Sequence, residues 1–207
     1  DRKENVGKSC LSQWYMCLFM IDDVYYNCME QYMMAEKARI FGDEDIWQQI
    51  MTSHDPMTIR DLGRKVRNFN AYVWKKNCQE VVKRGNLAKF SQIPKLREYL
   101  LGTGDKILVE ASPKDTIWGI GLAEDDAAAC NPHLWQGENL LGFILMEVRD
   151  ILRDNVQERE DDIEKALLMW TMGAGNSARR FNNEDPMPSK TEIAQKWGNP
   201  LSVYVSV

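Results

Sequence analysis

Glu30 and Lys37 are two residues whose types and spacing indicate chemistry. They lie seven positions apart in the segment NCMEQYMMAEKA, which is predicted to be helical, so both fall along one side of the helix. Both border an apolar stripe of 3.6-residue period, which consists of Met29, Tyr32, Met33 and Ile40. A lysine at such a border is partly removed from water. Its pKa is then lowered, and the free amine becomes available as a nucleophile.

Each of these two residues also has a purely structural interpretation. A lysine at a helix edge is most often solvated. The pattern Asn27-x-x-Glu30 is typical of a capping box, in which the two side chains satisfy backbone N–H groups at a helix start. Spacing alone therefore leaves both residues open to a structural or a catalytic role.

The elements that position this helix are predicted from turn and periodicity signals. Two strands in LSQWYMCLFMIDDVYYN are expected to flank a turn at Ile21-Asp22-Asp23. A helix should begin at Asn27. Three further helices are predicted from Asp55-Pro56 to near Asn68, from Ala71 to about Phe90, and from Pro94 to Gly102.

The second half of the chain is predicted to contain a hairpin, a long loop and a helix. Residues 107–111 (ILVEA) and 116–122 (TIWGIGL) have strand character and are separated by a turn segment. The loop 124–139 precedes a helix from Leu140. The expected fold class is α+β, a mainly helical single domain with a small antiparallel sheet. We place this domain at residues 10–155, followed by a C-terminal extension, 156–207, of helix, linker and a second helix or tail.

Composition limits the classes of function. The chain has 207 residues and a net charge of −5, which argues against coating nucleic acid by bulk electrostatics. The five cysteines are scattered without a CxxC pair and only two histidines are present, so no zinc site or other cofactor is expected. No apolar run is long enough for a membrane span and no secretory signal is visible, which predicts a cytoplasmic, intracellular protein with no membrane partner. The first residue is not Met, so an upstream targeting segment stays open.

Two long motifs carry a family resemblance. ILVEASPKDTIWGIGL and WQGENLLGFILMEVRD, read together with the helix that contains Glu30 and Lys37, resemble the NADAR family, also called YbiA-like. The resemblance covers about Leu11 to Arg153. The chain departs from the family near its start, where Leu11-Ser12-Gln13-Trp14-Tyr15 replaces an FLSNF-like opening, and where Glu30-Gln31-Tyr32 replaces EHY.

This resemblance implies an enzyme that cleaves N-glycosidic bonds of ribose. It implies that Lys37 attacks the anomeric carbon and gives a ring-opened imine, while Glu30 stabilises the positive charge on the sugar or carries protons. Two substrate types follow, ADP-ribosylated guanine in nucleic acid or nucleotides and phosphoribosyl-amine intermediates of riboflavin synthesis, and we favour the first. A non-catalytic reader of ADP-ribose or NAD is the alternative; it would keep Trp118 but need neither Lys37 nor Glu30.

Further substrate contacts are predicted in the loops. Trp118 and Gly119 could receive a planar ligand, although a strand tryptophan is more often part of the core. Trp135 and Asn139 precede the late helix, whose first N–H groups suit a phosphate, and structural capping is the alternative. Trp14 stands in the altered opening segment.

Charged residues complete the predicted site. Asp115 and Asp126 are turn residues by default, and either could assist the leaving base. The basic segment between Arg60 and Lys89 is expected to be mostly a solvated helix face. Within it, Arg64 is the best candidate to meet a pyrophosphate or a nucleic-acid backbone.

Overall fold

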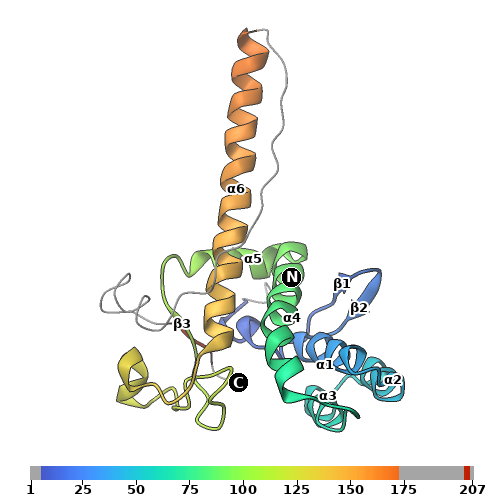
Figure 1. Ribbon diagram of the computed structural model, residues 1–207. Coiled ribbons are helices and arrows are strands. Elements are labelled where there is room, and N and C mark those ends of the chain that lie inside the picture. The colour runs from blue at the N-terminus through green and yellow to red at the C-terminus, as the bar shows by residue number, and fades with distance from the viewer. Residues whose placement is uncertain (1–5, 173–202, 206–207) are drawn as a thin grey trace, which may run out of the picture.

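The computed structural model describes residues 6–172 and 203–205, and Figure 1 shows their arrangement. A mainly helical body carries one long helix that extends away from it. The elements in chain order are η1 (Lys8–Leu11), β1 (Phe19–Ile21), β2 (Val24–Tyr26), α1 (Met29–Ile40), α2 (Glu44–Thr52), α3 (Pro56–Gly63), α4 (Ala71–Gln92), α5 (Pro94–Gly102), β3 (Leu108–Glu110), η2 (Ala127–Cys130), η3 (Pro132–Leu134), α6 (Leu140–Met172) and β4 (Val203–Val205).

The hairpin before α1 forms as predicted. β1 and β2 pair antiparallel, with Phe19 opposite Tyr26. The two turn residues, Asp22 and Asp23, have φ angles of 50° and 62°. Two consecutive positive φ angles define a type I′ turn, which matches the twist of the strands and which aspartate tolerates better than most residues. The small antiparallel sheet of the predicted α+β fold is therefore present.

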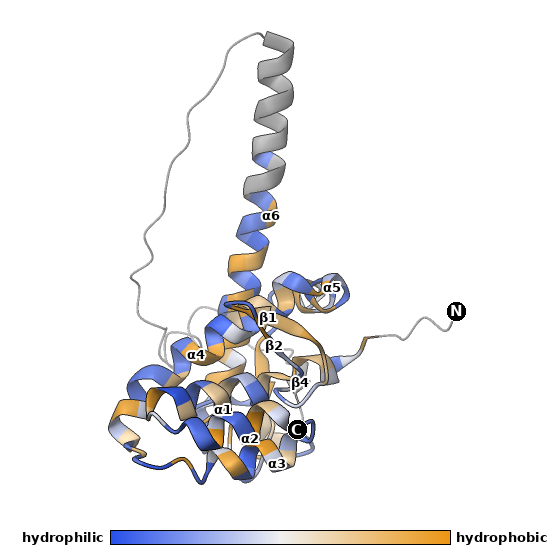
Figure 2. Ribbon diagram, turned by 90° about the vertical axis from the view of Figure 1, so that its right-hand side faces the viewer, coloured by the Kyte–Doolittle hydropathy of each residue, from blue (hydrophilic) through white to orange (hydrophobic). Residues whose placement is uncertain are grey.

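Helices α1, α2 and α3 form one side of the body (Figure 1). Helices α2 and α3 pack against α1, and α1 packs against α4. The ribbons of α2 and α3 alternate between hydrophilic and hydrophobic residues, as expected for helices with one buried side (Figure 2). Helix α2 was not predicted. It begins at the buried Asp43, which caps it by accepting from the Ile46 N–H and also binds Arg67, 2.5 Å from a guanidinium nitrogen.

Two glycines allow α1 to approach its neighbours closely. A Cβ built on Gly63 would overlap the side chain of Met34, and one built on Gly85 would lie 2.5 Å from atoms of Met29 and Tyr32. Helix α3 ends at Gly63, which corrects the predicted end near Asn68. The last carbonyls of a helix need outside partners, and the carbonyl of Gly63 accepts from Lys37 of α1.

The predicted strand 116–122 is wrong. In the structure this segment is a series of turns, because Asp115 Oδ1 accepts from the backbone N–H groups of Ile117 and Trp118 and folds the chain back locally. Strand β3 instead pairs in parallel with β4, with Glu110 opposite Val205.

Helix α6 is continuous across residue 155, the predicted end of the first domain. Its first half is buried on the body through Leu141, Ile144, Leu145, Val148 and Leu152, and its second half extends beyond the body (Figure 1). The domain boundary itself stays a prediction. The predicted linker after residue 172 and the predicted helix at 191–198 lie outside the described residues. No helix in the described part of the chain is both long and apolar enough to cross a membrane.

Candidate functional site

The start of α1 does not form the predicted capping box. The N-cap residue is Cys28, and its side chain makes no capping hydrogen bond. The backbone N–H of Asn27 donates to the Gln31 side chain, and the N–H of Glu30 donates to the carbonyl of Gln13, 2.9 Å away. The first turn of α1 is therefore satisfied without the Glu30 carboxylate, so capping does not explain why a glutamate stands there.

The Glu30 side chain is buried, with 5% of its surface exposed. Burial raises the pKa of this carboxyl to about 7. A hydrogen bond from the Trp14 side chain and the charges of Arg60 and Arg64 lower the pKa, and the charge of Asp115 raises it. Glu30 can therefore accept and release a proton near neutral pH, as a group that carries protons in a reaction must do.

Trp14 reaches Glu30 from a short segment that α4 holds in place. The buried ammonium of Lys89 donates to the Ser12 carbonyl at 3.0 Å, and the Gln13 amide lies 3.5 Å from the Asn86 side chain. On the other side, the guanidinium of Arg60 stands 5.5 Å from the centre of the Trp14 ring. The predicted contact residue Trp14 thus lies at the site.

The Lys37 amine lies between a helix end and aromatic rings. It donates to the Gly63 carbonyl at 2.8 Å and stands 4.3 Å from the centre of the Phe69 ring and 5.8 Å from that of Trp74. The pKa of Lys37 is lowered, first by burial and then by the charge of Arg64, while Glu30 raises it. The side chain is only half-buried, so the amine combines a lowered pKa with access from outside.

Arg64 affects both groups from the surface. It caps the C-terminus of α3, its side chain is 68% exposed, and it pairs with Asp61 at 3.5 Å. Its positive charge lowers the pKa of both Glu30 and Lys37. Arg64 is therefore close enough to act on the two predicted catalytic residues, and its exposed guanidinium is accessible to an anionic group.

The loop around Asp115 adds a third side to the site. Asp115 acts on Glu30 through its charge, and its own Oδ1 holds the backbone of Trp118 at 2.8 Å. Trp118 is half-buried and packs against the core. No side chain fits at Gly119, because a Cβ would lie 2.8 Å from the Glu110 carbonyl oxygen and 2.9 Å from that of Asp115. Stacking of a ligand on Trp118 stays a prediction.

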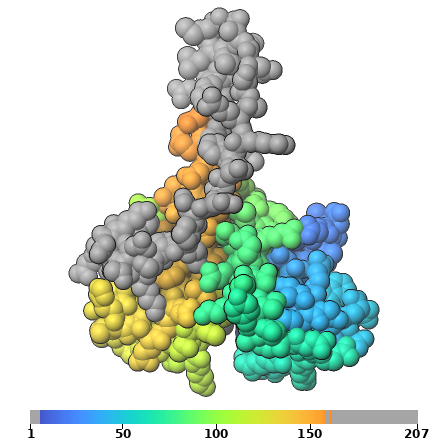
Figure 3. Space-filling model, viewed as in Figure 1, coloured from blue at the N-terminus to red at the C-terminus, as the bar shows by residue number. Residues whose placement is uncertain are grey.

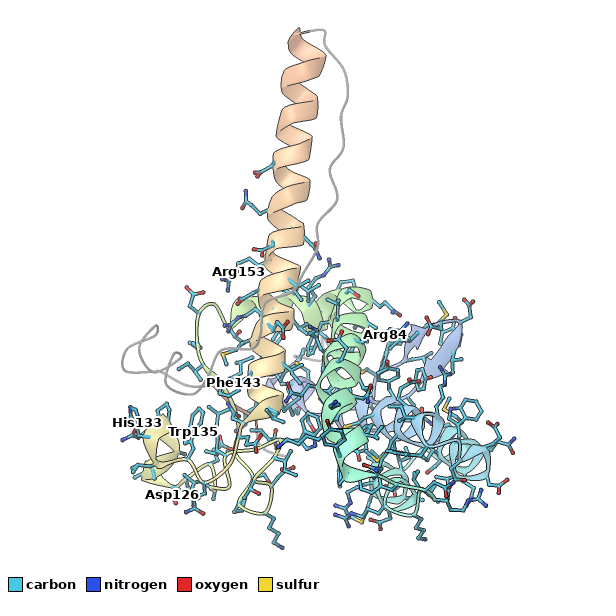
Figure 4. All side chains as sticks on the ribbon, viewed as in Figure 1. Arg84, Asp126, His133, Trp135, Phe143 and Arg153 are labelled. Atoms are coloured by element: carbon cyan, nitrogen blue, oxygen red, sulfur yellow. The ribbon has the colours of Figure 1, made fainter. Side chains whose placement is uncertain are left out.

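Three predicted contact residues have structural partners elsewhere. Asp126 is exposed and caps η2 through the Ala128 N–H at 2.8 Å. The Trp135 indole donates to the Ala129 carbonyl at 2.8 Å, and its ring faces Phe143 at 6.4 Å between centroids. Figure 4 shows Asp126 and Trp135 together in the lobe that holds η2 and η3, away from α1. In the space-filling view this lobe, coloured yellow, and the α1–α3 side, coloured blue to teal, lie on opposite sides of α4 (Figure 3).

Asn139 is fully buried and holds β3 to the loop before α6. Its amide donates to the Leu108 carbonyl at 3.0 Å and its side-chain oxygen accepts from the Glu110 N–H at 3.0 Å. Its φ of 55° is one that asparagine tolerates. With both ends of the amide satisfied, Asn139 positions Glu110, while a contact of Trp135, Asp126 or Asn139 with substrate stays a prediction.

Three residues at the site were not among the predicted ones. Phe69 and Trp74 flank the start of α4 and contact Lys37. Glu110 is buried, and its pKa is raised to about 8 by burial and by Asp115, which also acts on Glu30. A charged residue inside the apolar run ILVEA was the available signal for Glu110. In the described part of the chain, no three His, Cys, Asp or Glu side chains gather as a metal site would require.

Comparison with known proteins gives the class to which this site belongs. The family model of the NADAR domain matches residues 2–153, about three quarters of the chain. The chain therefore belongs to the NADAR family, which confirms the resemblance carried by its motifs.

Named relatives and one solved structure agree with this assignment. An N-glycosidase of Acanthamoeba polyphaga mimivirus is 44% identical over 153 residues, covering 72% of this chain and 90% of the relative. A riboflavin biosynthesis protein of Vibrio vulnificus is 30% identical over 145 residues, which are 70% of this chain and 36% of that protein. The NMR structure of Escherichia coli YbiA is similar with a TM-score of 0.61 at 27% identity, covering 74% of this chain and 85% of YbiA.

Proposed function

We propose that this protein removes ADP-ribose from ADP-ribosylated guanine in nucleotides or nucleic acid. The observation that carries the proposal is the pair formed by Lys37 and Glu30 on one side of α1, each with its pKa displaced toward neutrality. The coarser statement follows from the family: relatives are named N-glycosidases, and this chain is an enzyme of that class, a hydrolase that acts on N-glycosyl bonds.

The first chemical step uses the free amine of Lys37. Its nitrogen bonds to C1′ of the ribose while the bond from C1′ to the base nitrogen breaks, and the bonding electron pair leaves with the base. Burial and the charge of Arg64 favour the neutral amine that this attack requires. Positive charge that develops on C1′ and O4′ is stabilised by the Glu30 carboxylate.

The second step releases the sugar. The C1′–O4′ bond opens, O4′ takes up a proton and the lysine nitrogen loses one, which gives an imine between Lys37 and C1′. Water then adds to C1′ and the amine leaves, so the sugar is freed and Lys37 regenerated. Glu30, with a pKa of about 7, exchanges the protons of these steps.

Guanine is favoured over a riboflavin intermediate by the surroundings of Lys37. Phe69, 45% exposed, presents an aromatic ring beside the amine, and exposed Arg64 supplies a positive charge within reach of the same group. A ring and a guanidinium suit a purine and a pyrophosphate. The second candidate, a phosphoribosyl-amine intermediate of riboflavin synthesis, is supported by the name of the Vibrio vulnificus relative.

A direct comparison of the two substrates tests the proposal. The protein is incubated with ADP-ribosylated guanosine and, separately, with a phosphoribosyl-aminopyrimidine, and the released sugar is measured by mass spectrometry. We expect kcat/KM to be at least about tenfold higher for the guanosine substrate, which corresponds to about 1.4 kcal/mol of transition-state binding. A preference for the aminopyrimidine would assign the second function. Binding of ADP-ribose without turnover of either substrate would assign a reader.

A further inference from the structure

Glu110 is the last residue of the fully buried strand β3. β3 is buried at all three positions, and Glu110 is 3% exposed. Its backbone is held on both sides: its N–H donates to the Asn139 side chain at 3.0 Å, and its carbonyl accepts from the Ile120 N–H at 2.9 Å. The backbone of Glu110 is therefore held in place by the loops on both sides of it.

One oxygen of the carboxyl group lacks a structural partner. Its Oε2 atom is buried and has no hydrogen-bond partner among the described residues. Asp43 shows the contrast, because its equally buried carboxylate accepts from Arg67 and from the Ile46 N–H. An unpartnered buried carboxyl costs stability, and native proteins retain such groups mainly where they have a function.

The Glu110 carboxyl belongs to the same region as Glu30. Among the described residues, Asp115 is the only charged group that shifts the pKa of Glu110, and Asp115 also acts on Glu30. A Cβ on Gly119 would lie 3.2 Å from the Cγ of Glu110. Because Gly119 has no side chain, the Glu110 side chain has room beside it. No charged group among the described residues of α6 shifts the pKa of Glu110. Helix α6 approaches β3 at Gly142, where a Cβ would overlap the Leu108 carbonyl oxygen.

We propose that Glu110 is the general acid that protonates the departing base. As the C1′–N bond breaks, the electron pair moves to the base, and the Glu110 carboxyl transfers its proton to a nitrogen or oxygen of that base. Glu110 is left as a carboxylate and regains its proton from water after the base has gone. Glu30 then stabilises the sugar and exchanges its protons, while Glu110 protonates the leaving group. This inference rests on the N-glycosidase reaction proposed above.

The protonation state of Glu110 suits this role. Burial first, and then the charge of Asp115, raise its pKa to about 8, so the group is mostly neutral at pH 7. A neutral carboxyl can donate a proton, whereas an ordinary surface glutamate at this pH cannot. Because Glu30, Asp115 and Glu110 interact, the steps seen in a pH profile belong to the cluster of the three groups.

The test is Glu110→Gln, with Glu98→Gln on the exposed surface of α5 as the matched control. We expect Glu110→Gln to lower kcat by about 10²- to 10⁴-fold at pH 6.5, the usual contribution of general acid catalysis, with little change in KM. The ratio of wild-type to variant kcat should fall as the pH passes about 8, because the wild type then loses the same proton. A ratio below about threefold at every pH would overturn the proposal.

A second substrate separates catalysis from a structural role. When the guanine is methylated at N7, the base already carries a positive charge and leaves without an added proton. We expect Glu110→Gln to lose at most about tenfold on this substrate. An equal loss on both substrates would show that Glu110 is only structural and would overturn the proposal. A circular dichroism melt of each variant confirms that it is folded.

The same variants distinguish failure of this inference from failure of the proposed function. If the wild type turns over only the phosphoribosyl-aminopyrimidine, guanine is excluded as the base, and the ratio and its pH dependence are measured on that substrate with the same criteria. If the wild type turns over ADP-ribosylated guanosine and Glu110→Gln has the same kcat, the proposed function stands and the proposed role of Glu110 is wrong. Turnover of neither substrate overturns both.

Discussion

Two lysines with lowered pKa values occupy different surroundings in this protein. Lys37 is half-buried at the edge of α1, between the Phe69 ring and the Gly63 carbonyl. Lys89 of α4 is fully buried, donates to the Ser12 carbonyl, and its pKa is lowered to about 8 by burial. The charges that act on Lys37 come from Arg64 and Glu30, whereas those that act on Lys89 come from the thiols of three cysteines, Cys17 foremost.

This comparison shows that a lowered pKa does not by itself identify a nucleophile. The lowered pKa of Lys89 favours the free amine, but the side chain is buried and a substrate cannot reach it. Its hydrogen bond to the Ser12 carbonyl holds the segment that carries Trp14. Lys37 has access, an aromatic ring 45% exposed beside it, and a carboxyl with a pKa of about 7 on the same helix. A reactive lysine needs the shifted pKa together with an open approach and a partner that carries protons.

The largest expected effect comes from changing each lysine in turn. Lys37→Ala should lower kcat by at least about 10³-fold, because it removes the nucleophile, and should leave substrate affinity within a few-fold. Lys89→Met should retain kcat within about tenfold. Borohydride added during turnover should reduce the imine and leave a ribosyl adduct that peptide mass spectrometry maps to Lys37. An adduct on Lys89, or normal turnover by Lys37→Ala, would break the distinction between the two lysines.

The stability of Lys89→Met should differ from the wild type in its pH dependence. The pKa of Lys89 is about 8 in the folded protein and 10.5 as a reference, so folding releases a proton between these values. This contribution to the free energy of unfolding is fully present above pH 10.5 and is lost as the pH falls through 8. Urea unfolding of both proteins measures this contribution. Between pH 7.5 and pH 10, the free energy of unfolding of the wild type should rise by roughly 1–3 kcal/mol relative to that of the variant. If the two proteins differ in free energy of unfolding by the same amount at both pH values, Lys89 stays protonated in the folded protein.

These two sites also show what the sequence alone can reveal. Glu30 and Lys37 were found because helical periodicity places them together, and their motif resembles a family. Lys89 was expected on a solvated face and is 0% exposed, because its partner Ser12 lies 77 residues away in the chain. Glu110 was missed for a similar reason, since its role depends on Asp115 and on the turn that replaces the predicted strand 116–122. Local patterns predict elements and their borders; partners distant in sequence decide burial.

A smaller effect is expected from Arg64, which acts on Lys37 from the surface. Its charge lowers the pKa of Lys37, so Arg64→Ala should raise that pKa and move the pH dependence of adduct formation at Lys37 to higher pH. Because the side chain is 68% exposed, water screens the effect, and we expect a loss of only about two- to tenfold in kcat at pH 7. Lys65→Ala, also exposed, is the control. The pH dependence of unfolding that Lys89 produces should not change, and a parallel shift there would point to a general electrostatic effect.

The smallest expected effect concerns the end of the chain, which lies far in sequence from both lysines. Removal of residues 173–207 deletes β4, whose three residues pair with β3, while the groups that act on Lys37 and Glu30 come from residues 13–115. We therefore expect kcat to stay within about threefold and the melting temperature to fall by a few degrees, as a loss of about 1 kcal/mol would produce. Kinetics and a thermal melt of the protein ending at Met172 measure both. A loss of activity without unfolding would instead mean that β4 holds the strand of Glu110 in register, and that the site extends beyond the two lysine regions.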